Sequence, residues 1–232
     1  MRGKTILVID DDLNIRKMTE HLFAKEGAQV FTATNGIDGL RKFYEHRPDL
    51  IILDIMMPEE DGWETCRNIR KFSDVPIVML TALKTDEDIT RGLNYGADDF
   101  VTKPFSPGVL LARARAVLRR TGAYVAEDKP FMYSDGYLTI DLRAHRVIIK
   151  GQPVKLTPTE FQLLVYLAQN SGRVLTLQQI LENVWGWEYQ DSLEYVHVYM
   201  SHVRKKIEED PKQPKYIVTE HGTGYRFEKQ YP

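Results

Sequence analysis

The sequence contains a single cysteine, Cys66, which excludes an internal disulfide and a metal site built from several cysteines. No apolar run approaches the roughly 18 residues that a membrane-spanning helix needs. Met1–Lys4 lead into a short apolar segment instead of the apolar core of a signal peptide. We therefore expect a protein of the cytoplasm without a membrane segment.

Neither sign of charge is in excess. The 232 residues include 31 Lys and Arg against 33 Asp and Glu, a formal net charge of −2. Residues 1–121 carry 18 basic and 19 acidic side chains, and the remainder carries 13 and 14, so neither half is a basic domain. Composition alone therefore does not indicate a nucleic-acid-binding protein. It is ordinary for a chain of one large or two small globular domains.

The first half alternates short apolar segments with helical patterns. The apolar segments, typical of buried strands, are Thr5–Ile9, Val30–Ala33, Leu50–Leu53, Ile77–Leu80 and Phe100–Val101. Helical spacing follows each of them, from Ile15 to a stop at Gly27 and then near residues 37–46, 61–71, 86–94 and 107–120. This alternation predicts an α/β doubly wound, five-stranded parallel sheet with helices on both faces. Ligands of such sheets bind beyond the carboxyl ends of the strands.

The second half has a different pattern, so we predict domains over residues 1–121 and 131–232, joined by a linker over 122–130. Short strands are expected at Tyr137–Asp141, Arg146–Ile149, Val154–Leu156, Tyr216–Thr219 and Tyr225–Glu228. Helices should begin at Thr157 and Thr176, each with a capping hydroxyl and a Glu or Gln three residues later. A longer helix should cover about residues 191–209. Sheet, three helices and a terminal hairpin predict an α+β winged-helix domain.

Polar side chains follow the predicted parallel strands. Asp10 and Asp11 come after the first strand and Asp54 after the third, so three carboxylates should meet at one sheet edge. Clustered carboxylates repel one another, and a hard cation such as Mg²⁺ resolves that repulsion. Thr81 and Lys103 end the fourth and fifth strands and add a hydroxyl and an ammonium group. Such groups around one carboxylate would stabilise a phosphoryl group transferred to Asp54.

Simpler interpretations of these residues remain open. Asp10–Asp12 could be a solvated cap for the following helix, and Thr81 could be a strand-end hydroxyl without a further role. Asp61, Asp98 and Asp99 are expected to be turn and surface residues and not metal ligands.

Four segments of residues 4–121 resemble the receiver domain of bacterial two-component response regulators: Asp10-Asp11, Asp54–Pro58, Thr81-Ala82 and Lys103-Pro104-Phe105. The resemblance implies that Asp54 accepts a phosphoryl group from a sensor histidine kinase. It implies a Mg²⁺ site formed by Asp54, Asp11, Asp10 (mainly through water) and the backbone carbonyl of Met56. Lys103 would pair with the carboxylate or the phosphoryl group, and the Lys103–Pro104 bond would be cis.

The same resemblance implies that Thr81 and Phe100 report phosphorylation to the rest of the chain. Phe100 could also be a plain core residue, and both roles are compatible.

The resemblance further implies a homodimer when phosphorylated, paired through a face that contains Asp99 and Arg113. Ile89 and Val109 occupy positions that are usually charged, which predicts a more apolar interface. Ile89 and Val109 could instead be ordinary, partly buried helix residues.

Phosphohydrolases similar to haloacid dehalogenase also form aspartyl phosphates, and they carry a second Asp two positions after the nucleophile. Met56 occupies that position here. We therefore expect no enzyme, but a phosphoacceptor with slow self-dephosphorylation.

Residues 131–230 resemble the winged-helix effector domain of the OmpR/PhoB-like response regulators. The matching segments are Leu156–Phe161, Val184–Gly186, Val203–Ile207 and Gly222–Phe227. The resemblance implies a transcription factor that binds double-stranded DNA, with RNA polymerase as a further partner. For such a contact Trp187 is the candidate, whereas we expect Trp185 to be a core anchor.

The candidate DNA-binding residues lie on the long helix, on the N-cap residue of the helix before it, and on the terminal hairpin, which is called the wing. They are Thr176, Tyr195, His197, Tyr199, Ser201, His202, Arg204, Lys205, His221, Gly222 and Arg226. Tyr, His and Ser stand where Arg, Asn or Gln usually read bases, and the wing carries Glu220. The basic residues Arg204–Lys206 could simply complement a helix C-terminus. A phospho-regulated protein–protein module is therefore the alternative function.

Overall fold

The structure, a computed structural model, describes residues 1–57, 61–82, 92–122, 132–189 and 192–230. The contacts divide the chain into two compact units, Met1–Arg119 and Arg120–Pro232. Residues 123–130 of the predicted linker lie outside the described residues. In the part of the chain that the structure describes, no helix has the length and apolar character needed to cross a membrane.

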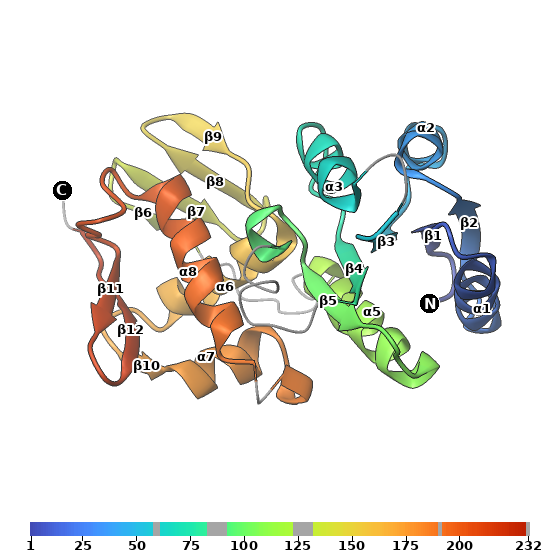
Figure 1. The fold of residues 1–232 in the computed structure, drawn as a ribbon. Coiled ribbons are helices and arrows are strands. Elements are labelled where there is room, and N and C mark those ends of the chain that lie inside the picture. Colours follow the sequence, from blue (N-terminus) through green and yellow to red (C-terminus); the bar gives the residue numbers. More distant parts are fainter. Residues whose placement is uncertain (58–60, 83–91, 123–131, 190–191, 231–232) are drawn as a thin grey trace. The chain divides into compact units, whose positions relative to one another are not determined.

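The first unit is a parallel sheet covered by helices on both faces, as predicted. Its strands are β1 (Thr5–Ile9), β2 (Gln29–Ala33), β3 (Leu50–Asp54), β4 (Ile77–Thr81) and β5 (Asp99–Thr102), in the order β2-β1-β3-β4-β5. The helices are α1 (Leu13–Lys25), α2 (Gly36–His46), α3 (Gly62–Arg70) and α5 (Pro107–Gly122), of which residues up to Arg119 belong to this unit. Figure 1 shows α1 and α5 on one face of the sheet and α2 and α3 on the other. Most of the helix predicted over 86–94 lies outside the described residues.

The core of the first unit explains this layering. Alternate strand residues such as Ile6, Val8 and Val78 pack against Phe23 of α1 and Leu110 of α5, and all five are fully buried. The intervening strand residues Leu7, Ile51 and Leu53 are buried as well. Both faces of the central strands are therefore covered, which is why these strands are continuous apolar runs in the sequence.

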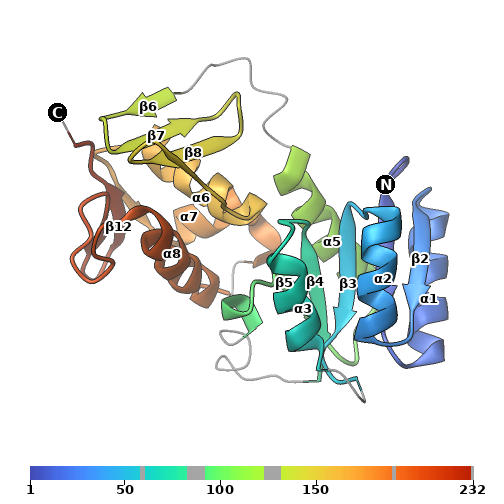
Figure 2. The same cartoon turned by 90° about the horizontal axis from the view of Figure 1, so that it is seen from above.

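The second unit has the predicted winged-helix architecture, and its described residues form two antiparallel sheets and three helices (Figure 2). The helices are α6 (Pro158–Gln169), α7 (Leu177–Val184) and α8 (Glu194–Ile207), with a short 3-10 turn η2 (Trp187–Tyr189) before α8. One sheet contains β6 (Met132–Ser134), β7 (Leu138–Asp141), β8 (Arg146–Ile149) and β9 (Gln152–Val154). The other has the order β10 (Val174–Thr176), β12 (Gly224–Phe227) and β11 (Ile217–Glu220).

Among its described residues, the second unit has two strands that were not predicted and one that is shifted along the chain. β6 and β10 were not expected, and the strand predicted at Val154–Leu156 lies at Gln152–Val154. β6 and β10 have three residues each, too few to show an alternating pattern by themselves. Each is stabilised as a strand by its antiparallel pairing with a neighbour, β6 with β7 and β10 with β12.

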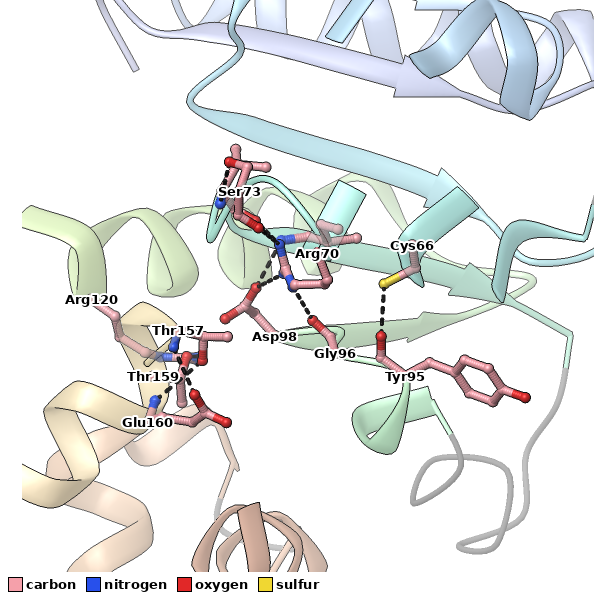
Figure 3. A network of polar contacts seen from close by, with 12 residues as sticks. Cys66, Arg70, Ser73, Tyr95, Gly96, Asp98, Arg120, Thr157, Thr159 and Glu160 are labelled. Atoms are coloured by element: carbon pink, nitrogen blue, oxygen red, sulfur yellow. Dashed lines mark hydrogen bonds and ion pairs between the residues drawn. The ribbon is translucent and has the colours of Figure 1, made fainter. Parts of the chain in front are cut away.

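Both predicted capping boxes are confirmed, and the one at α6 is largely buried. The Thr157 side chain accepts a hydrogen bond from the Glu160 backbone N–H, and the Thr157 N–H donates to Glu160 Oε2 at 2.7 Å. Glu160 is 3% exposed and also accepts a hydrogen bond from Lys206 of α8 at 2.6 Å. Figure 3 shows the Thr157–Glu160 box from close by.

Thr157→Ala should therefore lower the free energy of unfolding of the second unit by about 1 kcal/mol, the typical value of an N-cap. Urea denaturation followed by circular dichroism measures this loss. Thr157→Ser keeps the hydroxyl and is the matched control. A loss as large in Thr157→Ser as in Thr157→Ala would contradict a capping role for the hydroxyl.

Candidate functional site

The first candidate site lies at the carboxyl ends of β1, β3, β4 and β5. Because β1 lies between β2 and β3, the chain changes its direction of travel across the sheet at β1 and β3. This is the position at which parallel sheets bind ligands. Asp10 follows β1, Asp54 ends β3, Thr81 ends β4 and Lys103 follows β5. The strand-end residues predicted from the sequence are thus brought to one edge.

Three carboxylates meet at this edge. One oxygen from each of Asp10, Asp11 and Asp54 lies within 4.8 Å of the others. Asp10 and Asp54 are buried, whereas Asp11 is exposed to solvent. Carboxylate oxygens at this spacing suit a hard cation such as Mg²⁺, which also accepts water ligands.

Asp12 has a different role from these three residues. Its side chain accepts hydrogen bonds from the backbone N–H groups of Asn14 and Ile15, so it caps α1. Asp10 in turn accepts a hydrogen bond from the Asp12 N–H at 2.8 Å. The capping interpretation therefore holds for Asp12, whereas Asp10 points to the carboxylate cluster.

Lys103 is the positive charge of the site. Its Nζ lies 2.7 Å from Asp54 Oδ2 and 3.0 Å from Asp10 Oδ2. The Lys103–Pro104 peptide bond is cis. Burial opposes the charge on Lys103, but its hydrogen bonds to Asp54 and Asp10 outweigh burial and raise its pKa. Burial likewise raises the pKa of Asp10, although the hydrogen bond from Lys103 partly offsets it.

The backbone after β3 shapes the site around Asp54. The Met56 N–H donates a 3.3 Å hydrogen bond to Asp54 Oδ1, and the Met56 side chain is 62% exposed. A Cβ on Gly62 would lie 2.2 Å from the Asp54 carbonyl oxygen. Only glycine therefore allows the start of α3 to approach β3 this closely. The sequence contains this glycine, but its contact with Asp54 was not predicted.

Phe100 lies on β5, three residues before Lys103, and is 6% exposed. A Cβ on Gly92 would lie 2.1 Å from Phe100 Cζ and 2.8 Å from Trp63 Cη2. The phenyl ring thus fills space that exists because residue 92 has no side chain. Thr81 is also buried, one strand away at the end of β4.

Asp98, which the sequence placed at the surface, is fully buried and is a correction to that prediction. Its Oδ2 accepts hydrogen bonds from Arg70 at 2.7 Å and from the Ile77 N–H at 2.9 Å. Arg70 also donates to the Gly96 carbonyl at 2.8 Å, and Figure 3 shows this clamp. The interaction joins α3 to the turn before β5. Asp61 is exposed as predicted and caps α3.

Two of the four predicted dimer-face residues pair within one chain. Arg113 Nη1 lies 3.6 Å from Asp99 Oδ1, and Asp99 is buried and not a surface residue as first expected. Val109 is 48% exposed on α5. Ile89 lies outside the described residues.

The second candidate site is the exposed stripe of α8 with the adjoining hairpin. His197, Ser201 and Lys205 are exposed and follow one another at four-residue spacing, so they share one side of the helix. Thr176, the N-cap of α7, and the turn residues His221 and Gly222 are exposed as well.

Polar contacts join α8 to the hairpin β11–β12. His197 Nδ1 lies 2.9 Å from the Tyr225 hydroxyl. Arg204 donates from Nε to the Ile217 carbonyl at 2.9 Å and from Nη2 to Thr219 Oγ1 at 2.8 Å. The guanidinium of Arg204, predicted to contact DNA, is thus used to hold the hairpin.

Two predictions for α8 were wrong because more of the helix surface is buried than its regularly spaced apolar residues Val196, Met200 and Val203 indicate. Tyr195 and Tyr199 are 3% and 2% exposed, although the sequence placed both on the surface. The Trp185 ring packs against both of them, with a centroid distance of 5.2 Å to Tyr199. Burial also lowers the pKa of His202, which favours its neutral form.

The two tryptophans before α8 follow the prediction. Trp185 is fully buried, as expected of a core anchor, and Trp187 is 75% exposed. An exposed indole beside a candidate binding helix is available to a partner.

Arg226 of β12, the last of the candidate DNA-binding residues, pairs with two carboxylates. Its Nη2 lies 2.7 Å from Glu220 Oε1, and its Nη1 pairs with Glu228. The sequence placed Arg226 among the DNA-contacting residues without these partners.

Comparison with known proteins covers both units. The family described as response regulator receiver domain matches residues 6–115, and the family described as the C-terminal part of transcriptional regulatory proteins matches residues 151–227. The chain is 43% identical over 228 residues to the uncharacterized transcriptional regulatory protein YclJ of Bacillus subtilis (strain 168). That match covers 97% of this chain and 99% of YclJ.

Solved structures agree with these sequence matches. The response regulator DrrB, an OmpR/PhoB homologue of Thermotoga maritima, is 37% identical, with a TM-score of 0.53. A mutant of RitR is 26% identical, with a TM-score of 0.78. Each match covers 99% of this chain and 100% of the other.

Proposed function

This chain belongs to the OmpR/PhoB-type response regulators and is a transcriptional response regulator, and we propose from that premise that a phosphoryl group on Asp54 controls its binding to double-stranded DNA. The observation that supports this most directly is the surroundings of Asp54. Its carboxylate lies 2.7 Å from the Lys103 ammonium and shares the sheet edge with Asp10 and Asp11.

The donor would be the phosphohistidine of a sensor histidine kinase or a small acyl phosphate. A carboxylate oxygen of Asp54 attacks the phosphorus, the new O–P bond forms, and the donor leaves with the electron pair of the broken bond. Lys103 holds Oδ2, whereas the one contact described for Oδ1 is the longer hydrogen bond from Met56 N–H. Oδ1 is therefore the freer nucleophile.

Asp10, Asp11 and Asp54, with the backbone carbonyl of Met56, would hold Mg²⁺. When bound, the ion supplies positive charge that neutralises the carboxylates and the phosphoryl oxygens. The all-oxygen donor set supports this choice of metal. Lys103 would remain beside Asp54 and stabilise the negative charge of the phosphoryl group.

The signal would leave the site through β4 and β5. The Thr81 hydroxyl would donate a hydrogen bond to the phosphoryl group, and Phe100 would repack beside Gly92 in response. We propose that two phosphorylated copies then pair through the face that carries Val109, Asp99, Arg113 and Ile89. The Asp99–Arg113 ion pair described here within one chain would have to exchange for contacts between copies.

The DNA-contacting surface would consist of the exposed residues of the second unit, namely His197, Ser201, Lys205, Thr176, His221 and Gly222. Arg204 would act by fixing the hairpin to α8. Lys205 is the one lysine or arginine in this set, so a single copy should bind DNA weakly and with a shallow salt dependence. Linking two copies through their receivers would raise the affinity by making the second contact intramolecular.

Selection of duplexes from a random library tests this proposal. The full chain is used at about 50 mM salt, where electrostatic binding is strong, with and without beryllofluoride and Mg²⁺, which mimic the phosphoryl group. We expect enrichment of repeats about one helical turn apart, stronger with beryllofluoride. Enrichment that does not change with beryllofluoride would contradict phosphorylation control.

One observation favours a second candidate function. The pairing of Arg226 with Glu220 and Glu228 leaves the wing without a free guanidinium among the described residues. A protein–protein module regulated by the same phosphorylation would fit that surface, and the exposed Trp187 would suit a protein partner, RNA polymerase included. Absence of duplex enrichment in either state would favour this function.

A further inference from the structure

The solvent side of the wing carries one arginine between two glutamates. Arg226 donates from Nε to Glu220 Oε1 at 2.9 Å, and its Nη2 lies 2.7 Å from the same oxygen. Its Nη1 pairs with Glu228. The three side chains are 29%, 32% and 34% exposed, so the cluster is accessible from solvent.

The strand register accounts for this grouping. In the β11–β12 ladder Arg226 lies opposite Val218, and Glu220 lies opposite Gly224. Glu220 is therefore the diagonal neighbour of Arg226 on the partner strand, within reach of a long side chain. Glu228 directly follows β12, two residues beyond Arg226, and its pairing with Arg226 places both side chains on the same side. Tyr225 and Phe227 point to the other side and are buried.

Glu220 differs from Glu228 in its distance from the turn. It directly precedes His221 and Gly222, the exposed turn residues proposed to approach DNA, and it contacts two nitrogens of the Arg226 guanidinium. A phosphate that approached Arg226 would have to displace this carboxylate, and the displaced negative charge would still lie beside the phosphate. Exposed ion pairs are weak enough to be displaced, so the pair would reduce binding without abolishing it.

We propose that Glu220 sets the DNA affinity of the wing by occupying Arg226 and keeping it from the phosphate backbone. This inference rests on the proposed DNA-binding function of the second unit. It makes Glu220 a positioning residue that acts through Arg226. The consequence is low affinity in a single copy, so that stable binding depends on the pairing of two copies.

The test measures binding of the full chain to a 30-base-pair duplex of random sequence at several salt concentrations between about 50 and 200 mM, where the electrostatic contribution changes strongly. Glu220→Gln keeps the shape of the side chain and removes its charge. We expect about threefold to tenfold tighter binding at the lowest salt, and a slope of log K against log salt that is steeper by about 0.9 for one more phosphate contact. Glu220→Asp, which keeps the charge, should stay closer to the unsubstituted protein.

Glu209→Gln is the matched control. Glu209 is an exposed carboxylate of the same unit with two cationic partners, Lys150 at 2.7 Å and Lys215 at 3.5 Å. Its replacement changes the net charge by the same amount but leaves both carboxylates, Glu220 and Glu228, in contact with Arg226. An equal gain in affinity from Glu209→Gln and Glu220→Gln would show a net-charge effect and would overturn the proposal.

Arg226→Gln separates masking from simple repulsion. In the unsubstituted protein this change should weaken binding little, because the guanidinium is already occupied. In the Glu220→Gln background it should remove most of the gain in affinity and in salt slope. A gain that survives Arg226→Gln in full would contradict masking. Thermal unfolding of each variant identifies any loss of DNA affinity that comes from a misfolded hairpin.

The outcomes for the inference and for the proposed function are distinguishable. If the unsubstituted protein binds duplex and the Glu220 and Glu209 variants do not differ from it, the masking role of Glu220 is wrong and DNA binding stands. If no variant binds duplex even at the lowest salt, both the proposed function and the masking role are contradicted.

Discussion

Asp54→Asn should abolish covalent phosphorylation of the protein by a small acyl phosphate donor. An amide has no anionic oxygen to attack phosphorus, and no other carboxylate of the cluster has the same contacts with Lys103 and Met56 N–H. Loss of a nucleophile lowers the rate by at least on the order of a thousandfold. Intact-mass spectrometry measures the outcome directly as the presence or absence of one added phosphoryl group.

Asp61→Asn is the matched control for this substitution. Asp61 is exposed, lies outside the carboxylate cluster and caps α3 by accepting a hydrogen bond from the Trp63 N–H. Asparagine is also a good N-cap, so this variant should fold and accept a phosphoryl group as the unsubstituted protein does. Retention of the added mass in Asp54→Asn would place the phosphoacceptor elsewhere.

The carboxylate site could be predicted from the sequence because its geometry depends on local patterns. A buried parallel strand is a run of apolar residues, and the first polar residue after it marks the sheet edge. Asp10, Asp54 and Lys103 could therefore be placed together before any contact was known. The close approach of Gly62 to the Asp54 carbonyl could not, because it depends on where α3 packs and has no local signal.

Asp98 shows why some charged residues were misplaced. Its partner Arg70 is 28 residues away, and only the packing of α3 beside the turn before β5 brings the two together. A charged residue is rarely buried without a partner, so the surface was the reasonable expectation while the partner was unknown. The Arg226–Glu220 pair escaped prediction for the same reason, because the register of β11 and β12 creates it.

The surface of α8 shows the limit of helical periodicity. Val196, Met200 and Val203 identify the direction of the core correctly, and all three are buried. The width of the buried side depends on what packs along its margin, and here Trp185 packs against Tyr195 and Tyr199. Tyrosine has an apolar body, so it is buried readily when a neighbour covers it.

Mg²⁺ should stabilise the first unit against thermal unfolding, with an increase in its melting temperature of about 10 °C at a free concentration 100 times the dissociation constant. A ligand that binds only the folded state contributes about 2.7 kcal/mol at that concentration. A change of 1 kcal/mol moves the melting temperature of a unit of this size by about 4 °C. The physical reason is the repulsion among Asp10, Asp11 and Asp54, for which Lys103 supplies a single positive charge.

Asp11→Asn should remove most of this stabilisation by Mg²⁺ and should leave the metal-free protein at least as stable as before. Asp11 is the exposed member of the cluster, so its loss removes a charged metal ligand and one repulsive charge without breaking a buried ion pair. Asp12→Asn is the control, because Asp12 is the neighbouring residue, caps α1 and lies outside the cluster. Scanning calorimetry with and without Mg²⁺ measures both variants. An equal gain in melting temperature for Asp11→Asn and Asp12→Asn would mean that the ion binds elsewhere, because a ligand of the carboxylate cluster must lose affinity when one of its three charges is removed.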